Sequence, residues 1–189
     1  MAARQLEDQW RDAFARQARS DKQAYEGLSR QAGLAPCHRL HYLQMFLEKL
    51  SKALLWAGHR AIDGPPDFLG THGVIAKVLP MAVKEYRVRA KERALRRDEM
   101  EQLRALCREI DLLAPAVDDD GRRPDNCEYP WAGWQQGQPV VWAPCQWTFR
   151  VDARLRTPLG QSLLKTAFAL CENAADRPLS QPAGAYRYV

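Results

Sequence analysis

A leucine repeat between residues 37 and 60 constrains the fold of this 189-residue chain more than any other feature. Its apolar residues recur at spacings of three and four, and they are Leu40, Leu43, Phe46, Leu47, Leu50, Ala53, Leu54 and Ala57. A stripe of this width is typical of a helix at the centre of a bundle. We therefore expect an all-α protein in which helix 37–60 is central and its leucines are buried.

Weaker helical patterns lie on both sides of the leucine repeat. Residues 4–32 are polar and helix-forming, and Ser20 or Asp21 is placed to cap a second helical piece within them. Downstream, Thr71 is a candidate N-cap for a third helix. Pro80 lies inside that helix, so we expect a kink or a restart there.

The C-terminal half contains two further helix-start signals. Asp98 with Glu101 resembles a capping box. The apolar period continues from there to Leu113, and the pattern leaves open whether residues 81–113 form one helix or two. Thr157-Pro158 combines a capping residue with proline at the first turn, so it predicts the start of a last helix.

The segment 115–156 has a different character, because it is rich in proline and holds four of the six tryptophans. Its apolar runs 139–142 and 147–151 are expected to pair as a small hairpin. We expect a single domain over residues 1–175 that includes this aromatic, turn-rich insertion, followed by a C-terminal tail at 176–189.

Composition excludes several classes of protein. No apolar run reaches the roughly 18 residues of a membrane span, and the first residues lack the apolar core of a signal peptide. The five cysteines form no CxxC pair, which favours reduced thiols in a cytoplasm. Cys37, His38 and His41 lie close together, but a metal site needs a further ligand, so we expect neither a metal nor a cofactor.

The excess positive charge is concentrated in one stretch. The net charge is +5, and residues 84–97 hold seven Lys or Arg against two Glu, so the rest of the chain is balanced. If these residues form one helix, they present a stripe that can contact the phosphates of RNA or of a nucleotide, with candidate residues Lys84, Arg87, Lys91 and Arg97. The alternative is a solvated helix face without a ligand.

Residues 37–80 resemble the core signature of the HEPN superfamily, a group of small all-α domains. The matching residues are Gln44, Glu48, Lys49, Lys52, Ala53, Leu54, Leu55, Gly58, Thr71, His72 and Leu79. The resemblance implies a four- or five-helix up-and-down bundle that tends to dimerise. Members of the superfamily are ribonucleases of toxin–antitoxin, CRISPR and other defence systems, or proteins that bind nucleotides or serve as partners.

The ribonucleases of this superfamily share an Arg followed four to six residues later by His, and this chain departs from that pattern. The nearest match is Arg122-Arg123 followed by Cys127-Glu128-Tyr129, with Cys where the family has His. An unorthodox catalytic pair of Arg39 and His41 is the other candidate. Lys49 and Lys52 are family-like candidates for phosphate contact, and they are also suited to a structural ion pair with Glu48.

These observations favour a non-catalytic, HEPN-like interaction or regulatory subunit of a bacterial defence or toxin–antitoxin system. It would form a homodimer or a hetero-complex with another defence-system protein, and it would bind RNA or a nucleotide. Tyr129, Trp131 and Trp134 are the expected partner-binding residues, since interfaces are enriched in aromatic side chains. The alternative is a divergent, metal-independent endoribonuclease of the same superfamily.

Overall fold

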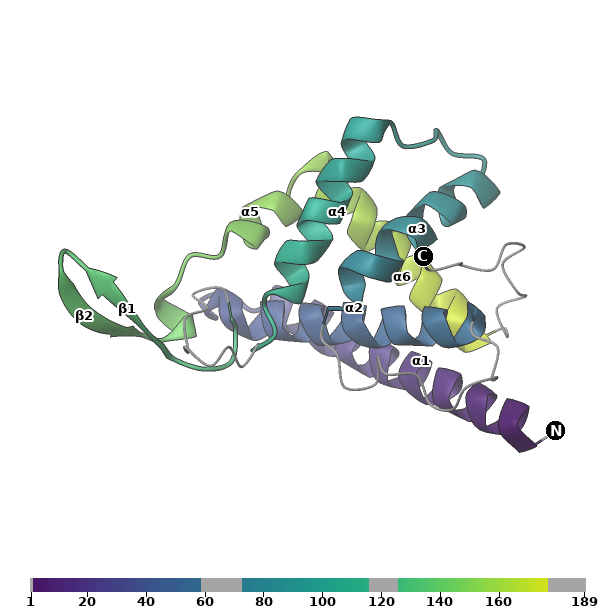
Figure 1. The fold of residues 1–189 in the computed structure, drawn as a ribbon, viewed down its shortest axis with the longest axis horizontal. Coiled ribbons are helices and arrows are strands. Elements are labelled where there is room, and N and C mark those ends of the chain that lie inside the picture. Colours follow the sequence, from purple (N-terminus) through teal and green to yellow (C-terminus); the bar gives the residue numbers. More distant parts are fainter. Residues whose placement is uncertain (1, 59–72, 116–125, 177–189) are drawn as a thin grey trace.

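The computed structural model describes residues 2–58, 73–115 and 126–176. These residues form six α-helices, one short 3-10 helix and a two-stranded sheet (Figure 1). In chain order they are α1 (Ala2–Ser29), α2 (Pro36–Gly58), α3 (Ile75–Arg89), α4 (Arg97–Asp111), β1 (Trp131–Gln135), β2 (Gln138–Trp142), η2 (Pro144–Gln146), α5 (Arg150–Leu155) and α6 (Pro158–Asp176). The expected helical class is confirmed.

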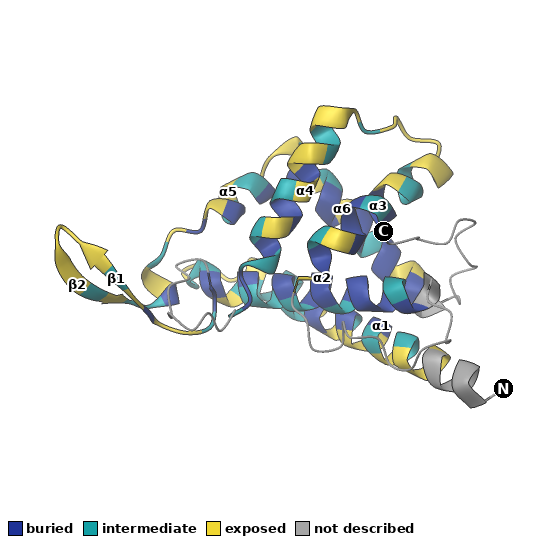
Figure 2. Cartoon of the chain, viewed as in Figure 1, coloured by how far each residue is buried: buried dark blue, intermediate teal, exposed yellow. Residues whose placement is uncertain are grey.

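Helix α2 lies at the centre, as its leucine repeat predicts. It contacts α1, α3, α4, α6 and η2. In Figure 1, α1 runs along one side of α2 and α3 and α4 rise from the other side. The stripe leucines Leu40, Leu43, Leu47 and Leu50 have no exposed surface, and Figure 2 shows burial along α2. They join one core with side chains of α3, α4 and α6, among them Ile75, Leu79, Leu103, Ile110 and Leu163. Leu54, which is also expected to be buried, is only partly buried at the edge of the core.

The expected break in the first helix is wrong, because α1 is continuous from Ala2 to Ser29. Asp21 is buried and accepts a hydrogen bond from Gln17 Nε2 at 2.9 Å, instead of capping a second helix. The small side chains of Ala15 and Ala18 are buried where α1 packs against its neighbours. Tertiary packing thus keeps the helix intact through residues that favour caps in isolation.

The basic stretch is not one helix, so the expected continuous stripe is wrong. Helix α3 runs through Pro80 without a restart and ends at Arg89. Lys91 then adopts a left-handed conformation with φ of 55°. Its N–H donates to the Val88 carbonyl at 3.2 Å, and the Glu92 N–H donates to the Arg87 carbonyl at 2.9 Å. This is a Schellman motif with lysine at the position that glycine usually occupies.

Helix α4 begins at Arg97, after seven residues that follow the end of α3, and its capping box differs from the expected one. The Glu99 carboxylate accepts the Arg96 N–H at 2.8 Å, so the box spans Arg96 and Glu99. Glu101 instead forms an ion pair with Arg97 at 3.2 Å. The expected box at Asp98 and Glu101 therefore lies two residues too late.

The start of α3 is capped by a side chain from the end of α4. Asp111 accepts the N–H groups of Ile75 and Ala76 at 3.1 and 2.9 Å. The expected cap, Thr71, lies outside the described residues, as does His72. At the last helix, the expected cap is present, because Thr157 Oγ1 accepts the Gly160 N–H at 3.2 Å.

The hairpin exists, but only one of its two strands is the expected one. Strand β2 contains the 139–142 run and pairs antiparallel with β1. The 147–151 run does not form a strand; it leads from η2 into α5, and Phe149 and Val151 are buried in the helical core. Residues 136 and 137 close the hairpin with φ values of 52° and 77°, which is the geometry of a two-residue type I′ turn.

Replacing Leu47 with alanine tests the central position of α2. The side chain is fully buried, so we expect Leu47→Ala to lower the free energy of unfolding by about 2–5 kcal/mol. Urea denaturation followed by circular dichroism measures this loss. The matched control is Val88→Ala, because Val88 is 62% exposed and its loss is expected to change stability little. Similar stability of the two variants would contradict the central position.

Asp111 makes stability depend on pH. Burial raises the pKa of Asp111 to about 6, against the opposing effect of its two backbone hydrogen bonds. Because the folded-state pKa lies above the unfolded-state value, this group favours folding below about pH 4 and loses that contribution as pH rises through about 6. We expect Asp111→Asn to remove this component, so that wild type loses stability relative to the variant between about pH 4 and pH 7. Urea denaturation across that range measures it, and a constant difference would contradict it.

Candidate nucleic-acid interface

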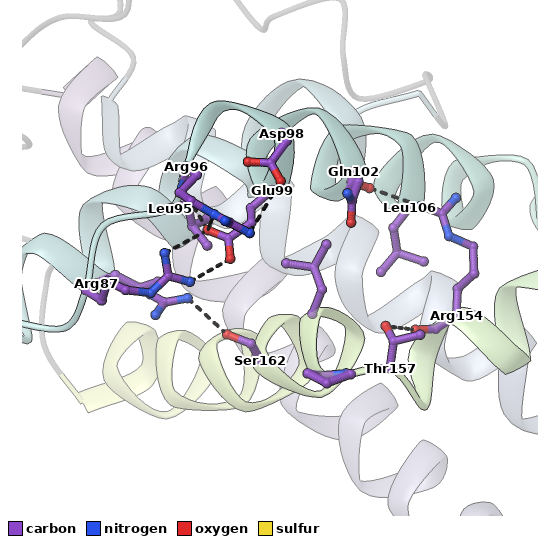
Figure 3. Close-up of a pocket in the computed structure, with 13 residues that line it drawn as sticks. Arg87, Leu95, Arg96, Asp98, Glu99, Gln102, Leu106, Arg154, Thr157 and Ser162 are labelled. Carbon is purple, nitrogen blue, oxygen red and sulfur yellow. Dashed lines mark hydrogen bonds and ion pairs between the residues drawn. The ribbon is translucent and has the colours of Figure 1, made fainter.

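A cleft of about 510 Å³ lies beside the turn between α3 and α4 (Figure 3). One wall is α4, and the opposite wall is the start of α6 with the end of α5. Arg87 stands at one end and Arg154 at the other. The lining residues are Arg87, Arg93, Leu95, Arg96, Asp98, Glu99, Gln102, Leu106, Arg154, Thr157, Pro158, Leu159 and Ser162.

The arginines of the cleft are held in place by carboxylates and hydroxyls. Arg93 makes a two-pronged contact with Glu99, at 3.0 and 2.6 Å. Hydrogen bonds from Arg93 and from the Arg96 backbone lower the pKa of Glu99 to about 2. Arg154 pairs with Glu109 at 2.6 Å and also donates to the Gln102 carbonyl. These contacts orient the guanidinium groups along the cleft walls.

Arg87 connects the cleft to the turn. Its Nη1 donates to Ser162 Oγ at 3.4 Å, and its Nε lies 3.3 Å from a Glu92 oxygen. The side chain is only 13% exposed, so it is a fixed part of the wall. Among the predicted phosphate-binding residues, Arg87 is the one that lines the cleft.

Three exposed cations at the end of α3 and in the turn that follows have no carboxylate partner in the described part of the chain: Lys84, Arg89 and Lys91. Arg97 is 94% exposed but is paired with Glu101. We call residues 84–97 the basic corner. It presents unpaired positive charges beside an arginine-lined cleft, and such charges are suited to contact phosphates through solvent-exposed, salt-sensitive interactions.

The side chains that line the cleft are suited to holding an anion. No histidine lines it, and its arginines stay protonated at all physiological pH values. Its carboxylates, Asp98 and Glu99, face cations, and the lowered pKa of Glu99 keeps that group ionised. Such a site can hold an anion, and the low pKa of Glu99 makes this carboxylate a weak base toward a ribose hydroxyl.

Lys49 and Lys52 belong to a different place, a buried polar network on α2. Lys52 Nζ contacts Glu48 Oε1 at 2.7 Å, and Gln44 Nε2 donates to Glu48 Oε2 at 2.8 Å. Lys49 Nζ reaches the same Glu48 oxygen at 3.3 Å. Glu48 and Lys52 are both about 97–98% buried, so this network stabilises helix packing and is poorly placed to meet a large ligand.

Arg39 and His41 do not converge. Positions two apart on a helix point about 200° from one another. Arg39 contacts Asp152 of α5 at 2.7 Å, whereas His41 Nδ1 lies 3.1 Å from Glu128 in the segment before β1. Each side chain thus bridges α2 to a different neighbour.

The aromatic partner-binding candidates divide by exposure. Trp131 is buried and packs edge-on against Trp147, with ring centroids 5.5 Å apart. Tyr129 and Trp134 are 60% and 77% exposed and are available to a partner. The candidates Arg122 and Arg123 lie outside the described residues.

Sequence patterns missed part of the cleft. Arg93 and Arg96 lie within the basic stretch and differ from their neighbours only in facing the cleft. Arg154 comes from α5, a six-residue helix with no clear periodic signal, and only tertiary structure brings it there.

The described residues contain no group of three or more His, Cys, Asp or Glu side chains that could hold a metal ion. Cys37 is buried whereas His38 is exposed, so they do not face a common site. All five cysteines are free. Across the same residues, no helix combines the length and apolar character needed to cross a membrane.

Comparison with known proteins found no relative of this chain. No family model matches the chain, and neither a curated protein nor a solved structure matches it.

The buried network predicts a large effect at Lys52 and a smaller one at Lys49. Lys52→Met leaves the Glu48 carboxylate buried without its closest cation, so we expect a loss of about 3–5 kcal/mol in the free energy of unfolding. The double variant Glu48→Gln with Lys52→Met removes both charges and is expected to recover most of that loss. Chemical denaturation measures both.

The control is Lys49→Met, because the Lys49 side chain is 20% exposed and lies farther from the Glu48 oxygen. Wild-type stability of Lys52→Met would show that Lys52 has no structural role, and would restore it as a candidate for ligand contact.

Proposed function

We propose that this protein is a non-catalytic, HEPN-like subunit of a bacterial defence or toxin–antitoxin assembly that contacts RNA through its basic corner. The observation that carries the proposal is the set of unpaired cations Lys84, Arg89 and Lys91 beside the arginine-lined cleft. Phosphate contact of this kind supplies affinity without requiring a particular base sequence.

The geometry of the corner supports an extended ligand over a small one. Lys84 and Arg89 lie on the last turns of α3, and Lys91 projects from the Schellman turn that follows. The cleft opens beside them, so a single-stranded backbone crossing the corner can meet several cations in succession. A mononucleotide would meet only part of this surface.

Two features support a binding role without catalysis. The cleft lacks a histidine, and the Arg39 and His41 side chains contact separate carboxylates on different elements. The resemblance of residues 37–80 to the HEPN signature is compatible with the helical architecture, and the departure from the Arg…His pattern supports placing the protein among the regulatory members of that superfamily.

Reversing the charge of Lys84, Arg89 and Lys91 to Glu tests the RNA contact. We expect RNA binding to be lost or weakened. Where binding remains, the slope of the logarithm of the binding constant against the logarithm of salt concentration should fall in magnitude by about 2, because about three single-strand phosphate contacts disappear. Stability is expected to stay nearly constant, since exposed charges contribute little to it. Fluorescence anisotropy with labelled single-stranded RNA and tRNA, at two salt concentrations, measures the effect.

The matched control reverses three exposed arginines elsewhere: Arg16, Arg30 and Arg150. None of them has a carboxylate partner in the described part of the chain, and the change in net charge is the same. RNA affinity that falls equally in both triple variants would indicate a general charge effect and contradict a site at the corner. Cleavage of RNA by wild type that is lost in His41→Ala would instead select the divergent ribonuclease.

Lys91→Gly separates binding from folding. Glycine adopts the left-handed conformation of residue 91 more readily than lysine, so we expect this variant to be as stable as wild type or more stable by up to about 1 kcal/mol. Its RNA affinity is nevertheless expected to fall, because one unpaired cation is removed.

A further inference from the structure

The hairpin formed by β1 and β2 extends beyond the helices as a projecting arm (Figure 1). Only β1 and β2 pair within it, so each strand has an outer edge without a strand partner among the described residues. Exposed edges of this kind are templates for pairing with another chain, and proteins usually protect them.

The turn geometry determines which backbone groups point outward. Gln135 and Gln138 flank the two-residue turn and form a hydrogen-bonded pair, as the ends of a type I′ turn do. Pairs alternate along an antiparallel ladder. The next pair, Trp134 with Pro139, is therefore not hydrogen-bonded, and its backbone N–H and C=O groups point away from the hairpin. The same holds for the pair of Ala132 with Val141.

The two edges differ in whether they can accept another strand. On β2, Pro139 has no N–H at an outward-pointing position, so that edge is interrupted. On β1, Ala132 and Trp134 each present an outward N–H and C=O. The sequence thus protects one edge of the arm and leaves the other open.

The arm is also uncharged and apolar on its outer face. Residues 129–149 contain no charged side chain, although the protein carries a net charge of +5. Trp134 and Val141 share the outer face and are 77% and 71% exposed. The excess positive charge of each copy lies in residues 84–97, so the uncharged arm adds no repulsion between two copies that meet there.

We propose that the open edge of β1 pairs with β1 of a second copy of this chain, forming a four-stranded antiparallel sheet across a two-fold axis at Gly133. In this register Ala132 lies opposite Trp134 of the partner, and Trp134 lies opposite the partner's Ala132. Both pairs are hydrogen-bonded, so the outward groups of β1 form four backbone hydrogen bonds. The large indole of each copy covers the small alanine of the other.

The same geometry explains the choice of occupant. A two-fold interface requires a surface that is complementary to itself. The edge of β1 meets this requirement, because the axis at Gly133 places the small Ala132 of one copy opposite the large Trp134 of the other. Two buried indoles contribute about 150–250 Å² each. Together they bury about 300–500 Å², well below the roughly 1,200 Å² of stable complexes, so we expect a weak, concentration-dependent dimer.

This inference specifies the partner in the regulatory role proposed above, but it depends on the arm and not on the basic corner. The RNA experiment changes residues 84–91, whereas the arm experiment changes residues 132–141. Failure of one proposal therefore leaves the other measurable on its own.

Proline substitution tests the open edge. Ala132→Pro removes an outward N–H without removing a hydrogen bond of the hairpin. We expect it to raise the dissociation constant of the dimer about tenfold or more, since each copy loses a donor. Val141→Pro makes the equivalent change on β2 and is the matched control, expected to leave the dissociation constant within about twofold. Sedimentation velocity over a concentration series measures both, and near-ultraviolet circular dichroism checks that the tryptophan packing persists.

A disulfide tests the register. Facing Gly133 residues form a non-hydrogen-bonded pair with Cα atoms about 4.5 Å apart, which is within disulfide range. A Cβ at Gly133 meets Trp142 at 3.5 Å, an ordinary contact, so Gly133→Cys is tolerated. We expect this variant, with Cys145→Ser to remove the exposed native thiol, to form a disulfide-linked dimer on mild oxidation. Gln135→Cys is the control, because its copies lie about 13 Å apart in this register.

The results that support the inference are dimerisation sensitive to Ala132→Pro alone and cross-linking through residue 133 alone. A monomer at every concentration tested would overturn it. So would a dimer that Ala132→Pro does not weaken, since the contact would then lie elsewhere, or equal cross-linking of the Gly133→Cys and Gln135→Cys variants.

Discussion

Helix α2 packs against other elements along most of its length. One of its sides is apolar, and the other carries buried polar and charged side chains. Its leucines meet the apolar faces of α3, α4 and α6. Glu48, held by Gln44 and Lys52, is also buried, and a buried carboxylate is tolerated only with such partners. The apolar side provides most of the stabilisation, while the polar network lies within α2 itself and satisfies its buried charges. Helices α1, α3, α4 and α6 all pack against α2, so their positions depend on its surface.

Sequence periodicity was sufficient where a helix has one wide apolar face and clear end signals. Helix α2 and the start of α6 at Thr157 were predicted for this reason. The break between α3 and α4 could not be predicted, because its Schellman turn uses Lys91 instead of glycine. The pairing of the hairpin was also wrong, since the run at 147–151 is apolar for burial in the helical core and not for strand pairing.

The sequence predicted which residues carry the positive charge of the candidate site, but it did not predict how the walls of the cleft are formed. The basic stretch identified where the excess charge lies, and it named Lys84 and Lys91 correctly as exposed cations. It could not show that Arg87 turns into a wall against Ser162, or that α5 brings Arg154 to the opposite end. These placements depend on contacts between residues 45 to 75 positions apart in the chain, and local patterns contain no information about them.

The residues of α2 that resemble the HEPN signature have a structural explanation that does not involve catalysis. Gln44, Glu48 and Lys52 recur every four residues, which places them on one face of the helix, where they satisfy one another in a buried setting. Any helix that buries a carboxylate at this position needs a similar set of donors. The resemblance therefore bears on how the helices pack, and it says nothing about RNA cleavage. Function in this protein has to be argued from its surfaces, which are the charged corner and the uncharged arm (Figure 1).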